Sequence, residues 1–166
     1  LPAEIEHIYP DYSLYPELCK DTAYGFLTRG CPRGCDFCIV GKKEGRCAVK
    51  VADLSEFWNG QKNIVLLDPN MFACRNWKEL SQQLIDSGAW VDFSQGCDIR
   101  IMTEEKAKYI RQMKIKQIHF AWDRYEDKDK ILNTFTMTGQ QGDHLVFNTE
   151  SGQFVTSDWK ATTYLK

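Results

Sequence analysis

The sequence predicts an α/β fold in which about four strand–helix units form part of a parallel β/α barrel. Four short apolar runs, at residues 23–28, 63–68, 90–94 and 117–122, alternate with stretches of helical periodicity. Strands separated by helical crossovers pair in parallel. A closed barrel needs roughly 200 residues or more. A chain of 166 residues is therefore expected to supply only part of one.

The first half of the chain divides into an extension and two strand–helix units. Residues 1–22 hold three of the five prolines and show no hydrophobic period, so we expect an extension from a missing upstream domain. Residues 51–58 look helical and would form the first crossover. A second helix is predicted over 76–87, where Gly88 supplies a stop signal, and a third over 103–113.

The second half of the chain ends the regular alternation of strands and helices. A charged helix is expected from about Glu126, and the core is expected to span residues 23–135. Residues 136–166 are rich in Gly and Thr and form an atypical tail. Their apolar runs at 144–147 and 153–156 flank the sequence NTESG, which is the pattern of a short hairpin.

Charge and hydropathy exclude several classes of function. The net charge is −2, and basic residues are scattered among acidic ones, so a nucleic-acid partner is not indicated. No run approaches the roughly 18 apolar residues of a membrane span, and the start lacks the layout of a secretory signal. A cytoplasmic protein is the expectation.

Three of the seven cysteines fall within eight residues, at Cys31, Cys35 and Cys38. An odd number with this clustering does not suit a secreted disulfide framework, whereas clustered thiolates are soft metal ligands. Pro32 and the neighbouring glycines supply the tight backbone that such a loop requires. The other four cysteines stand alone and are expected to be ordinary thiols: Cys19, Cys47, Cys74 and Cys97.

The spacing C-x3-C-x2-C lets three thiolates converge on one metal centre. A structural zinc site needs a fourth ligand, for which Cys47 is the nearest candidate. An electron-transfer [4Fe-4S] cluster also uses four thiolates, so three leave one iron open to a small molecule. The spacing alone leaves three interpretations: an open iron–sulfur site, a zinc site with a distant fourth ligand, and a chance cluster.

The segment YGFLTRGCPRGCDFCIVGKKEG resembles the first strand–helix unit of radical S-adenosylmethionine (SAM) enzymes. That family also has an aromatic residue before the third cysteine, which Phe37 matches. The similarity extends over about residues 11–127 and is closest to bacterial and phage members related to those with an upstream cobalamin-type domain. It implies that the three thiolates hold a [4Fe-4S] cluster, that SAM chelates its fourth iron, and that reduction yields a 5′-deoxyadenosyl radical. It further implies a reducing partner such as flavodoxin or ferredoxin. Lys42 and Lys43, which follow the loop, are expected to be solvated, and docking of that partner is the alternative.

The resemblance places SAM at the carboxyl ends of the strands. The Phe37 backbone would lie near adenine. Asp68 and Asn70 stand where the family has a Gly-Gly-Glu-like segment that binds the SAM amino group, although LLDPN departs from that pattern and a plain turn is an alternative. Arg100 has the planar fork that suits a carboxylate. The implied cofactor-binding set is Phe37, Asp68, Asn70, Gln95, Asp98, Arg100, Trp122 and Asp123.

Each of these assignments has a structural alternative. Phe37 could pack in the core, and Arg100 could form a surface salt bridge with Glu104 or Glu105. Trp122 and Asp123 could face a substrate or cap the next helix. His119 lies inside an apolar strand, so we expect a core histidine and no metal ligand.

The function expected from the sequence is that of a radical SAM enzyme, or a fragment of one, with an unknown substrate. One alternative is a small zinc-stabilised binding module in which Cys47 or Cys19 completes the site. Another is a fragment without function. A partial barrel leaves an edge strand unpaired, so an oligomer is possible unless the tail covers that edge.

Overall fold

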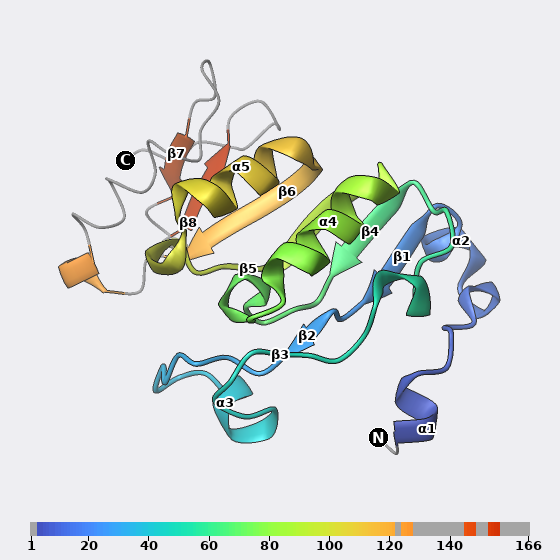
Figure 1. Ribbon diagram of the computed structural model, residues 1–166, viewed down its shortest axis with the longest axis horizontal. Helices are drawn as coiled ribbons and strands as arrows, with labels where there is room; N and C mark the ends of the chain where they lie inside the picture. The colour runs from blue at the N-terminus through green and yellow to red at the C-terminus, as the bar shows by residue number, and fades with distance from the viewer. Residues whose placement is uncertain (1–2, 122–123, 128–144, 149–152, 157–166) are drawn as a thin grey trace.

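A computed structural model describes residues 3–121, 124–127, 145–148 and 153–156 (Figure 1). Its main sheet has six strands in the order β1-β4-β5-β6-β8-β7. Four of them are parallel neighbours: β1 (Thr22–Gly25), β4 (Asn63–Leu66), β5 (Trp90–Cys97) and β6 (Lys114–Ala121). The predicted α/β class with a parallel sheet is therefore confirmed at this level.

The tail contributes the two remaining strands of the main sheet. β7 (Leu145–Asn148) and β8 (Gln153–Thr156) pair antiparallel, at the residues where the sequence shows its two apolar runs. β8 also pairs antiparallel with β6. The tail thus occupies the edge that β6 would otherwise leave open (Figure 1). The expected boundary between residues 135 and 136 lies outside the described residues.

Two helices, α4 (Trp77–Ser87) and α5 (Glu104–Gln112), cover one face of the parallel strands (Figure 1). Alternate strand residues such as Ile64, Val91 and Phe93 are buried there in one cluster with Leu80 and Ile110 from the helices. Side chains of the opposite face are less buried: Tyr24, Val65 and Asp92 lie in register across three strands and are all partly exposed. The sheet is therefore packed mainly from one side.

The predicted helices at 76–87 and 103–113 are confirmed, together with the stop signal at Gly88. Gly88 ends α4 in the left-handed conformation, at φ 62°. Thr103 caps α5, where its hydroxyl accepts a hydrogen bond from the Lys106 N–H at 3.3 Å. The described part of the segment after Glu126 belongs to a short 3-10 turn, η5 (Tyr125–Asp127).

The predicted helix over 51–58 is wrong. The N–H groups of Val51 and Ala52 donate to the Leu27 carbonyl, which draws this segment into extended backbone after β3 (Val49–Lys50). A single 3-10 turn, η2 (Leu54–Glu56), follows, closed by a capping box between Asp53 and Glu56. Long-range hydrogen bonds have overridden the local helical pattern.

The N-terminal extension contains α1 (Ala3–Glu6), η1 (Tyr12–Leu14) and α2 (Pro16–Cys19), and it runs beside β1, the other edge of the sheet (Figure 1). The Tyr12 hydroxyl accepts from the Tyr24 N–H at 2.9 Å. It lies 2.8 Å from the Phe57 carbonyl oxygen and 3.1 Å from the Tyr24 carbonyl oxygen, which compete for its proton. The Tyr12 hydroxyl therefore forms hydrogen bonds with outward-facing backbone groups of the edge strand β1.

Candidate functional site

The three-cysteine loop runs from Gly30 to Ile39, between β2 (Thr28–Arg29) and α3 (Val40–Lys43). Its first turn depends on Gly30, which has φ 80° and lies so close to the Cys47 carbonyl oxygen that a Cβ would stand 2.2 Å from that atom. The Cys31 N–H donates to the Gly45 carbonyl at 3.1 Å. These contacts fasten the loop to the segment that leads into β3.

A cavity of about 190 Å³ lies where this loop meets the carboxyl ends of β4 and β5. Eight of the residues singled out in the sequence line it: Cys31, Cys35, Phe37, Cys38, Asn70, Gln95, Asp98 and Arg100. A second cavity, of about 440 Å³, shares Cys31, Cys38, Pro69 and Gln95 with the first. The fold thus brings residues from three separate segments to one edge of the parallel sheet, where such folds bind ligands.

The cysteines fit a soft metal centre by their chemistry. All three are partly exposed and free of disulfides. Within the described residues, however, no three His, Cys, Asp or Glu side chains stand close enough to hold a metal ion. The fit therefore rests on the donor set and on the shared cavity. Cys47, the nearest candidate for a fourth zinc ligand, is exposed and does not line either cavity.

Asn70 is a buried polar residue that contacts a cysteine sulfur. It is 2% exposed, and its Nδ2 donates to Cys31 Sγ at 3.7 Å. Its Oδ1 is buried and has no hydrogen-bond partner among the described residues. Donors to cysteine sulfur stabilise the thiolate and tune a cluster bound there. An unpaired buried oxygen beside a cavity is also a ready acceptor for a ligand.

Asp68 has a different role from the one expected. It is 3% exposed and does not line the cysteine cavities. Its carboxylate accepts from the Leu27 N–H at 3.0 Å, the Thr28 N–H at 2.6 Å and the Thr28 hydroxyl at 2.6 Å. Burial raises the pKa of Asp68 to about 6, against the opposing effect of these hydrogen bonds. Asp68 therefore holds the backbone that leads into the cysteine loop.

Arg100 is held by carboxylates that the sequence analysis did not pair with it. Its Nε lies 2.7 Å from Asp98 Oδ1, and one terminal nitrogen lies 2.8 Å from Asp127 Oδ2. The expected alternative, a surface salt bridge with Glu104 or Glu105, is wrong, because these two glutamates pair with lysines and the Arg100 side chain is only 8% exposed. The Asp98 Oδ2 atom is left without a hydrogen-bond partner among the described residues.

Phe37 is 80% exposed, so the alternative that it packs in the core is wrong. An exposed aromatic ring at a cavity rim is available for contact with a ligand. Gln95 is exposed too and lines both cavities. Trp122 and Asp123 lie outside the described residues.

Two cavity residues, Arg33 and His119, were missed or misread in the sequence. Arg33 lies inside the loop, and its Nε stands 3.6 Å from Asp98 Oδ2. His119 was expected in the core but lines the cavity, and its Nδ1 has no partner among the described residues. Its place near the carboxyl end of β6 was the available signal. Cys97 also lines the cavity, but burial raises the pKa of its thiol far above the ordinary value, which opposes metal binding.

No protein-family model, curated protein or solved structure significantly matches this chain. In the part of the chain that the structure describes, no helix is long and apolar enough to cross a bilayer.

Proposed function

We propose that this protein is a radical SAM protein in which Cys31, Cys35 and Cys38 hold a [4Fe-4S] cluster. The observation that carries this proposal is the cavity at the carboxyl ends of β4 and β5, which all three cysteines line. When bound, the cluster would supply an open iron for SAM and the electron that cleaves it to a 5′-deoxyadenosyl radical.

The residues of the chain would bind and orient the two cofactors. Asn70 donates to the Cys31 sulfur, a contact that would tune a cluster held there. The exposed Phe37 ring offers a surface for a base. Asp98 offers its Oδ2 atom to a hydroxyl or amino group, because this atom has no hydrogen-bond partner among the described residues and lies 3.6 Å from Arg33 Nε. These contacts come from three segments of the chain, as the binding of an extended molecule requires.

A cation for the SAM carboxylate is available in Arg33. The Arg33 side chain is 31% exposed and, within the described residues, forms one ion pair with a carboxylate, at 3.6 Å. Arg100, the residue first proposed for this role, already contacts two carboxylates at 2.7 and 2.8 Å and is nearly buried. We therefore assign the carboxylate contact to Arg33, and to Arg100 the positioning of Asp98.

Anaerobic reconstitution with iron and sulfide tests this function. We expect about four irons and four sulfides per chain, and a change in the electron paramagnetic resonance spectrum of the reduced cluster when SAM is added. Alanine at Cys31, Cys35 or Cys38 should abolish iron uptake. Cys47→Ser is the matched control and should retain it.

Three outcomes would contradict the proposal. Stoichiometric zinc in the natively purified protein would favour the zinc-stabilised module. Loss of iron in Cys47→Ser would reveal a fourth protein ligand and close the open site. If the spectrum of the reduced cluster does not change when SAM is added, the chain is an iron–sulfur protein of another kind.

A further inference from the structure

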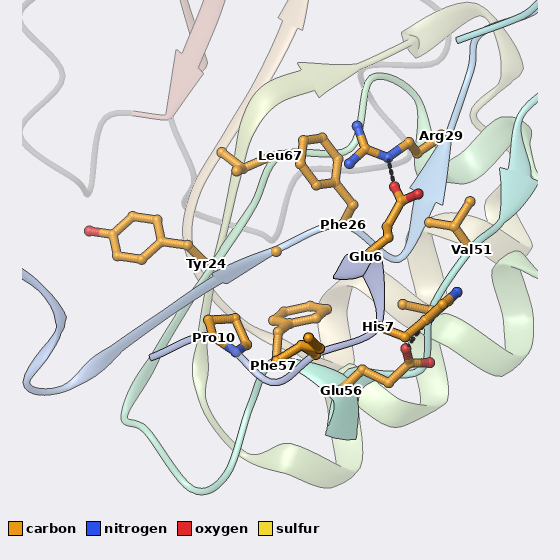
Figure 2. A pocket seen from close by; sticks show the side chains of 13 residues that line it. Glu6, His7, Pro10, Tyr24, Phe26, Arg29, Val51, Glu56, Phe57 and Leu67 are labelled. Atoms are coloured by element: carbon orange, nitrogen blue, oxygen red, sulfur yellow. Dashed lines mark hydrogen bonds and ion pairs between the residues drawn. The ribbon is translucent and has the colours of Figure 1, made fainter. Parts of the chain in front are cut away.

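A third cavity, of about 200 Å³, lies between the N-terminal extension and the start of the sheet (Figure 2). Its walls are largely apolar and come from segments far apart in the sequence. The apolar side chains that line it include those of Pro10, Tyr24, Phe26, Val51, Phe57 and Leu67.

One wall of this cavity is fixed by close packing. The Phe57 ring lies against the backbone of β1, where a Cβ on Gly25 would stand 2.3 Å from the ring. Phe57 is 4% exposed and belongs to the hydrophobic core. Because this wall is held by the core, this side of the cavity is preformed, and a ligand would bind against it without ordering it first.

The charged groups around the cavity are paired with one another. His7 Nδ1 lies 2.6 Å from Glu56 Oε2, and Arg29 Nε lies 3.0 Å from Glu6 Oε1, as the dashed lines in Figure 2 show. Arg29 also stacks over the Phe26 ring at 3.9 Å. A charged ligand would compete with these pairs, whereas an uncharged one would leave them intact.

The cavity adjoins the cysteine site. Phe26 and Leu67 line both this cavity and the one of about 440 Å³ that contains Cys31 and Cys38. A molecule seated here would thus be separated from the cysteine side by two side chains that directly follow the neighbouring strands β1 and β4.

We propose that this third cavity binds a small uncharged group, a single aromatic ring or a branched aliphatic chain. Its size fits such a group, because a closed apolar cavity of about 150 Å³ takes up benzene. Unlike that closed cavity, this one opens to solvent beside the exposed side chains of Ile8 and Tyr24. The aromatic walls favour ring contacts further. We assign this group to the apolar part of the substrate, an assignment that rests on the proposed function. The reacting part of the substrate would extend past Phe26 and Leu67 toward the cysteine site.

Toluene is the probe, and methyl nuclear magnetic resonance of the intact 166-residue chain, without cluster, is the measurement. We expect saturable shifts at the methyl groups of Leu67. Val51→Trp fills the cavity and should weaken toluene binding by at least about tenfold. Val49→Trp, in β3 and 50% exposed outside the cavity, is the matched control and should leave the affinity within about twofold. If Val51→Trp does not melt cooperatively, Ala52→Leu takes its place as a smaller filling of the same cavity.

Absence of saturable Leu67 shifts, or equal toluene affinity in Val51→Trp and the control, would overturn the proposal. The result is independent of the cluster. A chain that takes up iron and responds to SAM but does not bind toluene refutes only the apolar site. A chain that binds toluene but takes up no iron refutes only the proposed function.

Discussion

Replacing Tyr12 with phenylalanine should destabilise the protein through the edge of its sheet. The change removes one oxygen and keeps the ring, which packs against the hydrophobic core. It leaves the Tyr24 N–H without its partner at 2.9 Å and the Phe57 carbonyl without its partner at 2.8 Å. The contribution of packing to the free energy of unfolding is therefore unchanged, and the lost hydrogen bonds dominate the effect.

The magnitude follows from these contacts. A net hydrogen bond contributes about 0.5–1.5 kcal/mol, and a donor left unpaired in a buried place costs about 1–3 kcal/mol. Tyr12 is only partly buried, and water can reach some of the freed groups, so we expect a loss of about 1–2 kcal/mol in the free energy of unfolding. For a chain of this size that corresponds to a drop in Tm of roughly 2–8 °C.

Urea unfolding of the parent, Tyr12→Phe and Tyr15→Phe measures the effect. Tyr15 is 65% exposed, so its variant controls for the loss of a phenol hydroxyl in general and should unfold like the parent. Light scattering provides a second measurement, because the uncovered edge of β1 can then pair with a second chain. Equal stability of the two variants would refute the role that we assign to the Tyr12 hydroxyl.

The remaining predictions concern the cysteine site. Gly30→Ala should lower the thermal stability and the iron uptake more than Gly45→Ala, because both have positive φ but only the first would place a Cβ against a backbone oxygen; equal effects would show that the close approach at Gly30 is unimportant. In the protein loaded with its cluster, Arg33→Ala should raise the SAM concentration that gives half of the spectral change by about tenfold, and Arg33→Lys should raise it less. An unaltered response in Arg33→Ala would remove Arg33 from the site. The Asp68 carboxyl should titrate near pH 6 in ¹³C resonance spectra. Since this pKa is raised above the unfolded value, the contribution of Asp68 to stability is complete below about pH 4 and is lost as the pH rises through 6; a midpoint at or below 4 would contradict the burial argument.

The sequence by itself determined the elements that depend on local interactions. The helices at 76–87 and 103–113 were predicted with their ends, because Gly88 and Thr103 act on the backbone within a few residues of themselves. The parallel order of β1, β4, β5 and β6 followed from the alternation of strands and helices.

Only the tertiary structure decided the partners of the polar groups. Arg100 pairs with Asp127, 27 residues away, and Asp68 accepts from Leu27 and Thr28, about 40 residues away. Those distant contacts changed the expected roles of both residues. The segment at 51–58 likewise did not form a helix, because the Val51 and Ala52 N–H groups donate to the Leu27 carbonyl and only a 3-10 turn at Leu54–Glu56 follows. Hydrogen bonds and ion pairs between distant segments depend on how the elements pack, and local sequence patterns carry little information about that packing.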